Sequence, residues 1–257
     1  NNLRYTVDDG PCLRTTVFLK GCPLSIPWCS NPESQLADPE VSFRQAMCVG
    51  CGRCAALCPE HAIAIVKRKA SIDRARCRRC MTCVEACLND AMVLMGEQKS
   101  IEDVWKVVRR DRDYYEESGG GVTVSGGEPL MQADFVAALF RKLHEEGIHT
   151  CLDTTGFASA DALERVLAHT DLVLFDLKHM DSGKHRDIVG VPTEPIHENF
   201  KRIVNAGVEI IVRIPYIPEF NDDDENMHAT AEFVKSNAPS ALVNILPYHE
   251  YGSNKYG

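Results

Sequence analysis

The 257-residue sequence has little positive charge, with a formal net charge of −9 at pH 7 and an isoelectric point of about 5.5. Nucleic-acid binding needs basic surface that neutralises phosphates, so we expect no nucleic-acid partner. The sequence also lacks any apolar run near the roughly 18 residues that a bilayer span requires, so we expect no membrane association. Its first residues show no basic stretch followed by an apolar core. Nothing therefore directs export, and we expect a cytoplasmic protein.

Cysteine, in contrast, is abundant, with twelve residues. In a short exported chain this number would indicate a disulfide framework. Here nearly all of the cysteines precede residue 88, and most are separated by only two or three residues. The long remainder of the chain is poor in cysteine. This distribution predicts metal binding.

Two cysteine runs share the spacing CxxCxxCxxxC. Three thiolates at gaps of two wrap one face of a cubane 4Fe-4S cluster, and the fourth reaches the neighbouring cluster. We therefore expect two clusters, one held by Cys48, Cys51, Cys54 and Cys87 and the other by Cys77, Cys80, Cys83 and Cys58. Structural zinc knuckles are the alternative, but no histidine interleaves these cysteines, which favours iron. The module, residues 38–96, resembles a two-cluster ferredoxin and would carry electrons.

Beyond residue 96, short β-rich runs alternate with amphipathic helices, which is typical of a parallel α/β sheet. Ser100 and Asp103 form a capping pair before an apolar helical face. The expected strands are 14–20, 122–125, 149–153, 172–176, 209–214 and 241–246, and the expected helices lie near 101–108, 133–146, 160–168, 196–206 and 224–236. We predict an α/β fold, a partial (β/α)6 TIM-like barrel formed by residues 1–37 and 97–257, with the ferredoxin-like domain inserted after the first strand.

Candidate site residues recur at the carboxyl ends of these strands, where parallel barrels place their chemistry. They are Cys22 and Cys29 after the first strand, Gly126, Gly127, Glu128 and Pro129 after the second, Asp153, Thr154, Thr155 and Gly156 after the third, Asp176, Leu177 and Lys178 at the fourth, Arg213 in the fifth and His249 after the sixth. Each alone has an ordinary explanation as a turn, a surface ion pair or a loop histidine, but their recurrence at one rim predicts a site. We expect Cys151 to be a buried core residue, and His179 and His185 to be solvated.

Over essentially its whole length the sequence resembles the radical S-adenosylmethionine activating enzymes of glycyl radical enzymes. This group is related to pyruvate formate-lyase activating enzyme, here in the form with a two-cluster ferredoxin insert. The resemblance is carried by both cysteine runs and by DDGPCLRTTVFLKGC, PWCSNPES, VTVSGGEPL, LDTTGF, LFDLKHMD, VRIPYIPEFND and LPYHEYGSNKY. These stretches occur in the family's order, so the resemblance is specific.

The resemblance implies the cofactors and the residues that bind them. Cys22 and Cys29 would ligate a third 4Fe-4S cluster that chelates S-adenosylmethionine, and Lys178 would complete the catalytic set. Residues 126–128 would bind the methionine amino group, and Trp28 would lie against the adenine. The same cofactor would be lined by Ser30, Asp153, Asp176, Leu177, Lys178, Arg213 and His249, and a monovalent cation would lie near Asp153 and Asp176. Glu128, Lys178 and Arg213 would supply the charges that a zwitterionic methionine needs.

The resemblance also implies the reaction. S-adenosylmethionine is cleaved reductively to methionine and a 5'-deoxyadenosyl radical, which abstracts hydrogen from a backbone glycine of a partner glycyl radical enzyme. The electron would come from a flavodoxin or ferredoxin-type donor through the insert. An acidic donor could dock on the basic residues of the insert, Lys67, Arg68, Lys69, Arg74, Arg76, Arg78 and Arg79.

One position departs from the family's pattern of cysteine, three residues, cysteine, two residues, cysteine. In GCPLSIPWC the middle ligand is Ile26, whose hydrocarbon side chain cannot bind iron. Two thiolates hold a cluster poorly, and outer donors cannot replace a missing ligand. Ser25 offers only a weakly binding hydroxyl. Cys12 precedes the first strand and is about 23 Å along an extended chain from the site. The third cluster is therefore in doubt.

Two explanations of Ile26 remain. The chain is an impaired copy of an active enzyme, or it keeps the barrel and the insert for another task; the otherwise complete cofactor-binding set favours the first. The alternative functions are an electron-transfer or scaffold protein that uses only the ferredoxin-like clusters, and a radical S-adenosylmethionine enzyme that acts on another substrate.

Overall fold

The computed structural model describes residues 2–6 and 9–248, and its central element is a seven-stranded sheet. Its strands lie in the order β1 (Asn2–Thr6), β2 (Arg14–Leu19), β7 (Gly121–Gly126), β8 (His149–Thr154), β9 (Leu172–Asp176), β10 (Glu209–Tyr216) and β11 (Leu242–Pro247). Neighbours from β2 to β11 pair in parallel, whereas β1 pairs with β2 in the antiparallel sense. The predicted α/β fold with a parallel central sheet is confirmed.

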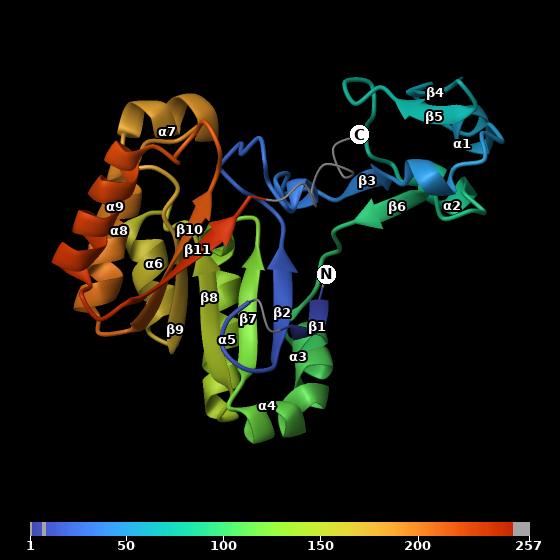
Figure 1. Ribbon diagram of the computed structural model, residues 1–257. Coiled ribbons are helices and arrows are strands. Elements are labelled where there is room, and N and C mark those ends of the chain that lie inside the picture. The colour runs from blue at the N-terminus through green and yellow to red at the C-terminus, as the bar shows by residue number, and fades with distance from the viewer. Residues whose placement is uncertain (1, 7–8, 249–257) are drawn as a thin grey trace.

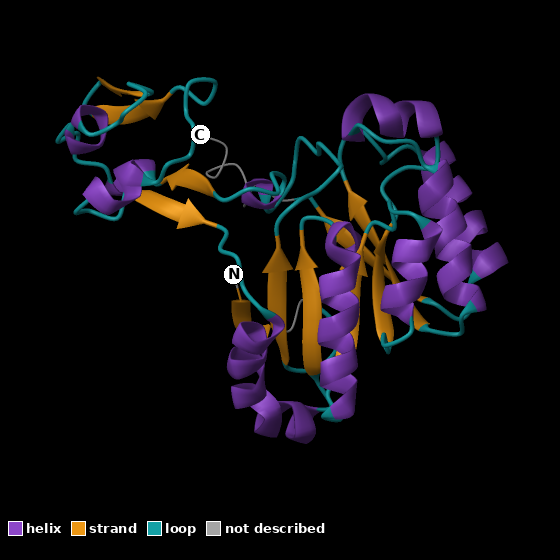
Figure 2. Cartoon of the chain, turned by 180° about the vertical axis from the view of Figure 1, so that it is seen from behind, coloured by secondary structure: helices purple, strands orange, loops and turns teal. Residues whose placement is uncertain are grey.

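Helices cover one face of this sheet (Figures 1 and 2). They are α3 (Ile101–Val108), α4 (Arg112–Ser118), α5 (Ala133–Glu145), α6 (Ala160–Leu167), α8 (Glu194–Asn205) and α9 (Asp224–Asn237), and α7 (Ser182–Val189) lies at the end towards which the parallel strands point. Strand residues such as Val124 and Phe175 pack with helix residues such as Phe140 in one buried core. None of the helices within the described ranges combines the length and the apolarity that a bilayer span requires.

Local signals account for most helix boundaries. Ser100 and Asp103 form the expected capping box before α3, in which each side chain accepts the other residue's N–H at 3.1 Å. Gly147, with a φ of 70°, follows α5 in the left-handed conformation that glycine adopts easily. The sequence pattern gives no sign of α7, because that helix buries only His185 and Val189.

The expectation that His179 and His185 are solvated is wrong. Their exposed fractions are 4% and 1%. The ring of His185 bonds to the Val191 carbonyl through Nδ1 at 2.6 Å, and Nδ1 of His179 accepts the Asp181 N–H at 2.9 Å. Both imidazoles therefore bond to the backbone on either side of α7. These bonds explain why two histidines in a polar stretch are buried.

The insert has its own small sheets and helices and projects from the end of the barrel towards which the parallel strands point (Figure 1). Its elements are β3 (Glu40–Phe43) paired with β6 (Met92–Met95), β4 (Ile63–Val66) paired with β5 (Lys69–Ile72), and the short helices α1 (Arg53–Ala56) and α2 (Thr82–Ala86). Four short 3-10 helices complete the description: η1 (Pro32–Ser34), η2 (Gln45–Met47), η3 (Arg109–Asp111) and η4 (Pro129–Gln132). The insert core contains Val41, Met92 and several cysteines.

Candidate functional site

The loop with Cys22 and Cys29 follows β2 at the carboxyl end of the sheet. Backbone hydrogen bonds tie its start to the segment that follows it: the N–H of Gly21 donates to the Ser34 carbonyl at 2.8 Å, and that of Cys22 donates to the Gln35 carbonyl at 2.9 Å. Both cysteines are half-buried, and burial raises the pKa of Cys22 to about 11. The two thiols therefore lie at the barrel mouth, in a fixed loop.

Ile26 is half-buried and packs against the main core together with Cys22 and Trp28. Its carbonyl accepts the N–H of Cys29 at 3.2 Å, so the backbone at this position closes a turn between the two cysteines. The donor set of the loop is therefore two thiols and a hydrocarbon. This set does not fit a cluster that needs three cysteine ligands.

The other two cysteines of the barrel do not supply the missing ligand. Cys12 is exposed and lies at the opposite end of β2, where the carbonyl of the next residue, Leu13, accepts the N–H of Gly121 at the start of β7. Cys151 is fully buried in β8, and burial raises the pKa of its thiol to about 12. The prediction that Cys151 is a core residue is confirmed.

A glycine pair joins the end of β7 to the cysteine loop. The N–H of Gly127 donates to the Leu19 carbonyl at 3.0 Å, and that of Glu128 donates to the Gly21 carbonyl at 2.8 Å. A Cβ at Gly127 would lie 2.3 Å from the Gly21 oxygen, and one at Gly126 would lie 2.3 Å from the Leu19 oxygen. Only glycine therefore allows the two loops to approach this closely.

We expect Gly127→Ala to lower the free energy of unfolding by about 1–3 kcal/mol, because the added methyl group forces the two loops apart. Urea unfolding monitored by circular dichroism measures this change. Gly183→Ala in α7 is the matched control, since its Cβ would approach only one side-chain atom, Oδ1 of Asp181, at 3.1 Å and no backbone atom outside its own helix. Equal stability of the Gly127→Ala variant and the unchanged chain would contradict the close-approach argument.

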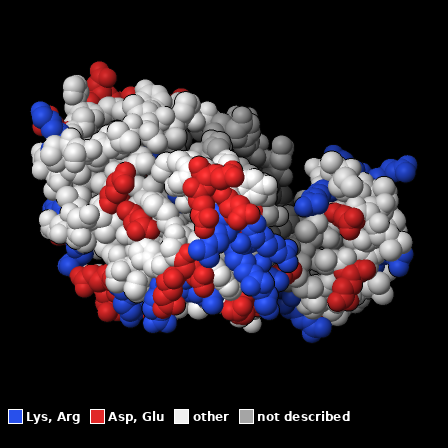
Figure 3. All heavy atoms as spheres, turned by 90° about the horizontal axis from the view of Figure 1, so that it is seen from below, with Lys and Arg blue, Asp and Glu red and all other residues white. Residues whose placement is uncertain are grey.

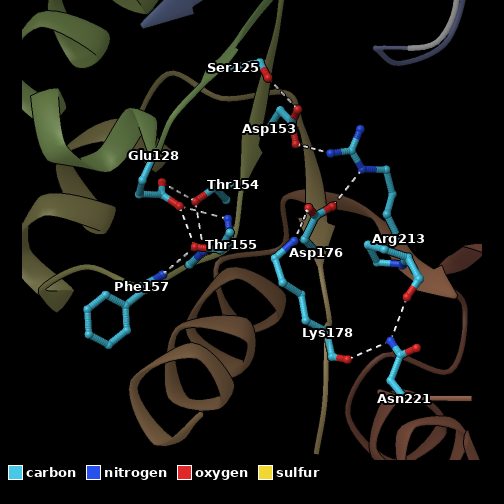
Figure 4. Close-up of polar contacts among 12 residues, drawn as sticks. Ser125, Glu128, Asp153, Thr154, Thr155, Phe157, Asp176, Lys178, Arg213 and Asn221 are labelled. Carbon is cyan, nitrogen blue, oxygen red and sulfur yellow. Dashed lines mark hydrogen bonds and ion pairs between the residues drawn. The ribbon is translucent and has the colours of Figure 1, made fainter. Parts of the chain in front are cut away.

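The carboxylate of Glu128 is fully buried and accepts four hydrogen bonds, and Figure 4 shows those from Thr154 and Thr155. One oxygen accepts from the Thr154 hydroxyl at 2.6 Å and the Leu130 N–H at 3.1 Å. The other accepts from the Thr155 hydroxyl at 2.6 Å and the Thr155 N–H at 2.9 Å. Burial raises the pKa of Glu128, and these donors oppose the shift. The side chain thus fastens the end of β8 to η4.

A chain of charged side chains crosses the ends of β8, β9 and β10 (Figure 4). Arg213 donates to Asp153 through Nη2 and to Asp176 through Nε, the latter at 2.9 Å. Lys178 Nζ donates to the second oxygen of Asp176 at 2.9 Å. The Ser125 hydroxyl donates to Asp153 at 2.7 Å. Parallel pairing of Arg213 with Asp176 places these side chains together, as the sequence predicts for strand ends.

The charges in this chain alternate, and burial sets their titration. Burial raises the pKa of Asp153 to about 6, although the Arg213 charge opposes the shift. Burial also acts on Asp176, but Arg213 and Lys178 outweigh it and lower the pKa of that carboxyl. The two carboxylates likewise outweigh the effect of burial on Arg213 and raise its pKa. Two cations and two carboxylates therefore face one another at the barrel mouth, a polar set suited to a zwitterionic ligand.

A row of aromatic rings lies beside the cysteine loop. Trp28 contacts Phe220 with ring centroids 4.7 Å apart, and Phe220 contacts His179 at 5.2 Å. Phe220 lies in the loop after β10, and the next residue, Asn221, is fully buried and donates to the Lys178 carbonyl at 2.8 Å. The loop after β10 therefore reaches both Trp28 and Lys178.

The remaining predicted residues have different surroundings. Leu177 is 2% exposed and belongs to the core, while its N–H donates to the Arg213 carbonyl at 2.9 Å. Ser30 is exposed. His249 lies outside the described residues. Sequence reasoning placed Thr154 and Thr155 at the rim but did not predict their bonds to Glu128, and it missed Phe220 as a site residue.

The insert brings its eight cysteines together in two sets. One hollow is lined by Cys48, Cys51, Cys54 and Cys87, and a second by Cys58, Cys77, Cys80 and Cys83. All twelve cysteines of the chain lie in the described part, and each is a thiol rather than half of a disulfide. The four cysteines of each hollow are the sets expected from the spacing, and their chemistry fits a 4Fe-4S cluster, which takes four thiolates.

In each run, the sulfur of the fourth cysteine accepts a hydrogen bond from a backbone N–H at the equivalent position. The Ala62 N–H donates to the sulfur of Cys58 at 3.3 Å, and the Ala91 N–H donates to the sulfur of Cys87 at 3.3 Å. In both cases the donor lies four residues after the cysteine. Such N–H groups stabilise thiolate charge at cluster sites, so the two halves of the insert repeat one ligand arrangement.

Comparison with known proteins adds two family matches. Residues 74–231 match the radical SAM superfamily, and residues 40–88 match a 4Fe-4S dicluster domain. The first match spans most of the barrel after the insert, and the second spans both cysteine runs.

Individual proteins are also similar. The chain is 41% identical to the benzylsuccinate synthase activating enzyme of Thauera aromatica, covering 98% of this chain and 78% of that protein. It is 42% identical to the trans-4-hydroxy-L-proline dehydratase activating enzyme of Clostridioides difficile, covering 100% of this chain and 85% of that protein. The solved structure of SuiB from Streptococcus suis bound to the precursor peptide SuiA is 17% identical, with a TM-score of 0.52 over 63% of this chain and 35% of that one, a likeness of fold alone.

Proposed function

Since the chain belongs to the radical SAM superfamily, among the activating enzymes of glycyl radical enzymes, we propose that it activates a glycyl radical enzyme by abstracting hydrogen from a backbone glycine of that partner. That activity needs an iron-sulfur cluster that supplies the electron for splitting S-adenosylmethionine into methionine and a 5'-deoxyadenosyl radical, and the Cys22 loop would hold such a cluster only with a third cysteine in place of Ile26. The observation that carries the proposal is the meeting of the cysteine loop, the glycine pair and the charged chain at one end of the sheet.

We propose that the charged chain binds the methionine part of S-adenosylmethionine. Lys178 and Arg213 are the cations for its carboxylate, and Trp28 lies against the adenine. The carboxylate of Glu128 already accepts four donors, so the backbone of residues 126–128 is the part of that segment suited to the amino group. Asp153 and Asp176 are the negative charges of this chain of side chains. The binding of a monovalent cation near them stays a prediction.

Ile26 supports a second candidate function for the unchanged chain. With two thiols in the loop, the chain retains the insert clusters and the barrel but lacks a ligand that the cleavage of S-adenosylmethionine requires. An electron-transfer or scaffold role uses the insert alone. We favour the impaired activating enzyme, because the glycine pair, Glu128 and the charged chain are all kept in contact around the altered loop.

The two candidates differ in an anaerobic assay with reductant and S-adenosylmethionine. An activating enzyme that is impaired only by Ile26 forms no 5'-deoxyadenosine above background as it stands, and forms it once cysteine replaces Ile26. It then produces a glycine-centred radical signal in a glycyl radical enzyme. A chain that forms no 5'-deoxyadenosine in either form, while its insert accepts electrons, would instead be an electron carrier.

We expect the reduction of the insert by an acidic flavodoxin or ferredoxin to slow as ionic strength rises, because exposed basic side chains attract such a donor. Figure 3 shows Lys and Arg side chains around the rim of the insert, which forms a separate lobe. Lys67 and Arg68 form the exposed turn between β4 and β5. Stopped-flow reduction of the double variant Lys67→Glu, Arg68→Glu should be slower at low salt. Lys235→Glu on α9 is the control, and an equal loss there would contradict docking on the insert.

A further inference from the structure

The two cysteine sets of the insert lie differently with respect to the barrel. A hollow of about 460 Å³ is lined by Cys77, Arg74 and Arg79 of the insert and by Pro32, Glu33 and Leu36, which follow the Cys22 loop. Cys77 also lines the hollow of its own cysteine set. The hollow around Cys48, Cys51, Cys54 and Cys87 is lined by insert residues alone. The set with Cys77 therefore faces the barrel, and the set with Cys48 faces away.

One segment of backbone separates Cys77 from the Cys22 loop. Pro32, Glu33 and Leu36 line the hollow beside Cys77, and the carbonyls of Ser34 and Gln35, which lie between them in the chain, accept the N–H groups of Gly21 and Cys22. The two sites are thus joined by a short stretch of hydrogen-bonded chain. Residues far apart in the sequence meet here because the insert leaves the barrel directly after the cysteine loop (Figure 1).

Lys20 fixes both connections between the barrel and the insert. Its Nζ lies 2.9 Å from the Glu40 carboxylate at the start of β3 and also contacts the Glu33 carbonyl. Its stem packs against Gly96 on the returning connection, where a Cβ would lie 2.3 Å from the Lys20 Cδ. The side chains of Lys20 and Glu40 are only 13% and 18% exposed. An ion pair this sheltered is screened less by salt than a surface pair.

Two further contacts lie beside this junction, but both join residues within the insert. Arg79 pairs with Asp38 at 2.9 Å, and Arg74 donates to the Val41 carbonyl at 2.6 Å. The Arg79 and Asp38 side chains are 40% and 78% exposed, so we assign this pair a minor role. Lys20 is the residue of the junction that stands directly before Gly21 and Cys22.

We propose that Lys20 is a positioning residue that holds the insert with the cluster of Cys58, Cys77, Cys80 and Cys83 towards the Cys22 loop. The cluster of Cys48, Cys51, Cys54 and Cys87 is then the outer one, on the side open to an electron donor. This inference rests on the proposed function only in that both sets hold iron-sulfur clusters. It does not depend on cleavage of S-adenosylmethionine.

Trp28 provides the test, because iron-sulfur clusters quench tryptophan emission by energy transfer that falls steeply with distance. The chain has two tryptophans, and Trp105→Phe leaves Trp28 alone. In this form, replacing Cys77 and Cys80 with alanine should raise the Trp28 lifetime several-fold. The matched change of Cys48 and Cys51 removes the other cluster and should leave Trp28 quenched. If the Trp105→Phe variant does not fold, the Trp28 emission is obtained by subtracting the emission of a Trp28→Phe variant from that of the chain with both tryptophans.

The role of Lys20 is tested in the same way. Lys20→Met should raise the Trp28 lifetime while iron content and circular dichroism stay unchanged, and Lys20→Arg should keep Trp28 quenched. Lys20→Glu should also raise the lifetime, and combining it with Glu40→Lys should restore quenching, which general destabilisation would not do. Arg112→Met, in an exposed ion pair on α4, is the control.

Three results would overturn this inference, each for a different reason. If the Trp28 lifetime rose equally in the two double-alanine variants, or rose more on loss of Cys48 and Cys51, the proposed orientation of the insert would be overturned. An unchanged Trp28 lifetime in Lys20→Met would overturn the role of Lys20. A preparation without iron-sulfur absorbance would overturn the cluster assignment. Activity does not enter the readout, so an inactive chain with the expected lifetimes would contradict the proposed function while leaving this inference intact.

Discussion

Replacing Ile26 with cysteine is expected to raise the iron content of the anaerobically reconstituted chain from about eight to about twelve atoms, since each 4Fe-4S cluster adds four. The variant should also form 5'-deoxyadenosine from S-adenosylmethionine well above the rate of the unchanged chain. Iron analysis with electron paramagnetic resonance measures the first quantity, and chromatography of the products measures the second. The reason is chemical: the loop holds two thiols, and the third ligand position is a hydrocarbon.

The local structure can accept this change. The Ile26 side chain is half-buried beside Cys22 and Trp28, and cysteine is smaller, so no clash is introduced. The backbone of residue 26 already closes a turn with Cys29, which keeps the three positions in one loop. Ile26→Ala is the control for lost volume and Ile26→Ser for a hydroxyl ligand; both should stay near eight irons. If Ile26→Cys gained no iron, some other feature of the loop would prevent assembly.

Glu128→Gln is expected to have the second-largest effect, a loss of about 3 kcal/mol in the free energy of unfolding together with weaker binding of S-adenosylmethionine. The amide nitrogen of glutamine would face N–H or O–H groups that now donate to a carboxylate oxygen, so buried donors would be left without acceptors. The end of β8 and the loop after β7 would then separate. Urea unfolding and titration calorimetry measure the two losses.

Two comparisons sharpen this prediction. Thr155→Val removes one of the four donors and keeps the carboxylate, so it should cost about 1 kcal/mol. Glu164→Gln changes an exposed glutamate that pairs with Arg202, and should stay within about 0.5 kcal/mol of the unchanged chain. A Glu128→Gln variant as stable as this surface variant would contradict the account of the buried carboxylate.

Much of the fold follows from patterns with a clear physical basis. The short apolar run 172–176 becomes a buried parallel strand because Val173 and Phe175 pack against the helices, while Leu172 and Leu174 join Cys151 and Ile211 in a second buried cluster. The Ser100 and Asp103 pair begins α3 as expected. The cysteine spacing also predicts the two sets of four that line the hollows of the insert. These features depend on residues close in sequence or on a rule of one fold class.

The rest depends on contacts that spacing does not reveal. The polar stretch that contains His179 and His185 looks solvated, yet both rings bond to the backbone around α7 and are buried. Glu128 was expected to meet a ligand, but its oxygens are occupied by Thr154, Thr155 and Leu130. The pairing of Lys20 with Glu40 joins two domains and has no local signature.

The metal content of the unchanged, anaerobically prepared chain tests the central claim most directly. Analysis of iron, zinc and sulfide, with Mössbauer spectroscopy to identify the clusters, should give about eight irons per chain, all in two 4Fe-4S clusters bound by the insert. Zinc in place of iron, or a chain without metal, would contradict the account of the cysteine sets. About twelve irons with Ile26 in place would contradict the conclusion that the loop of Cys22 and Cys29 cannot hold a third cluster.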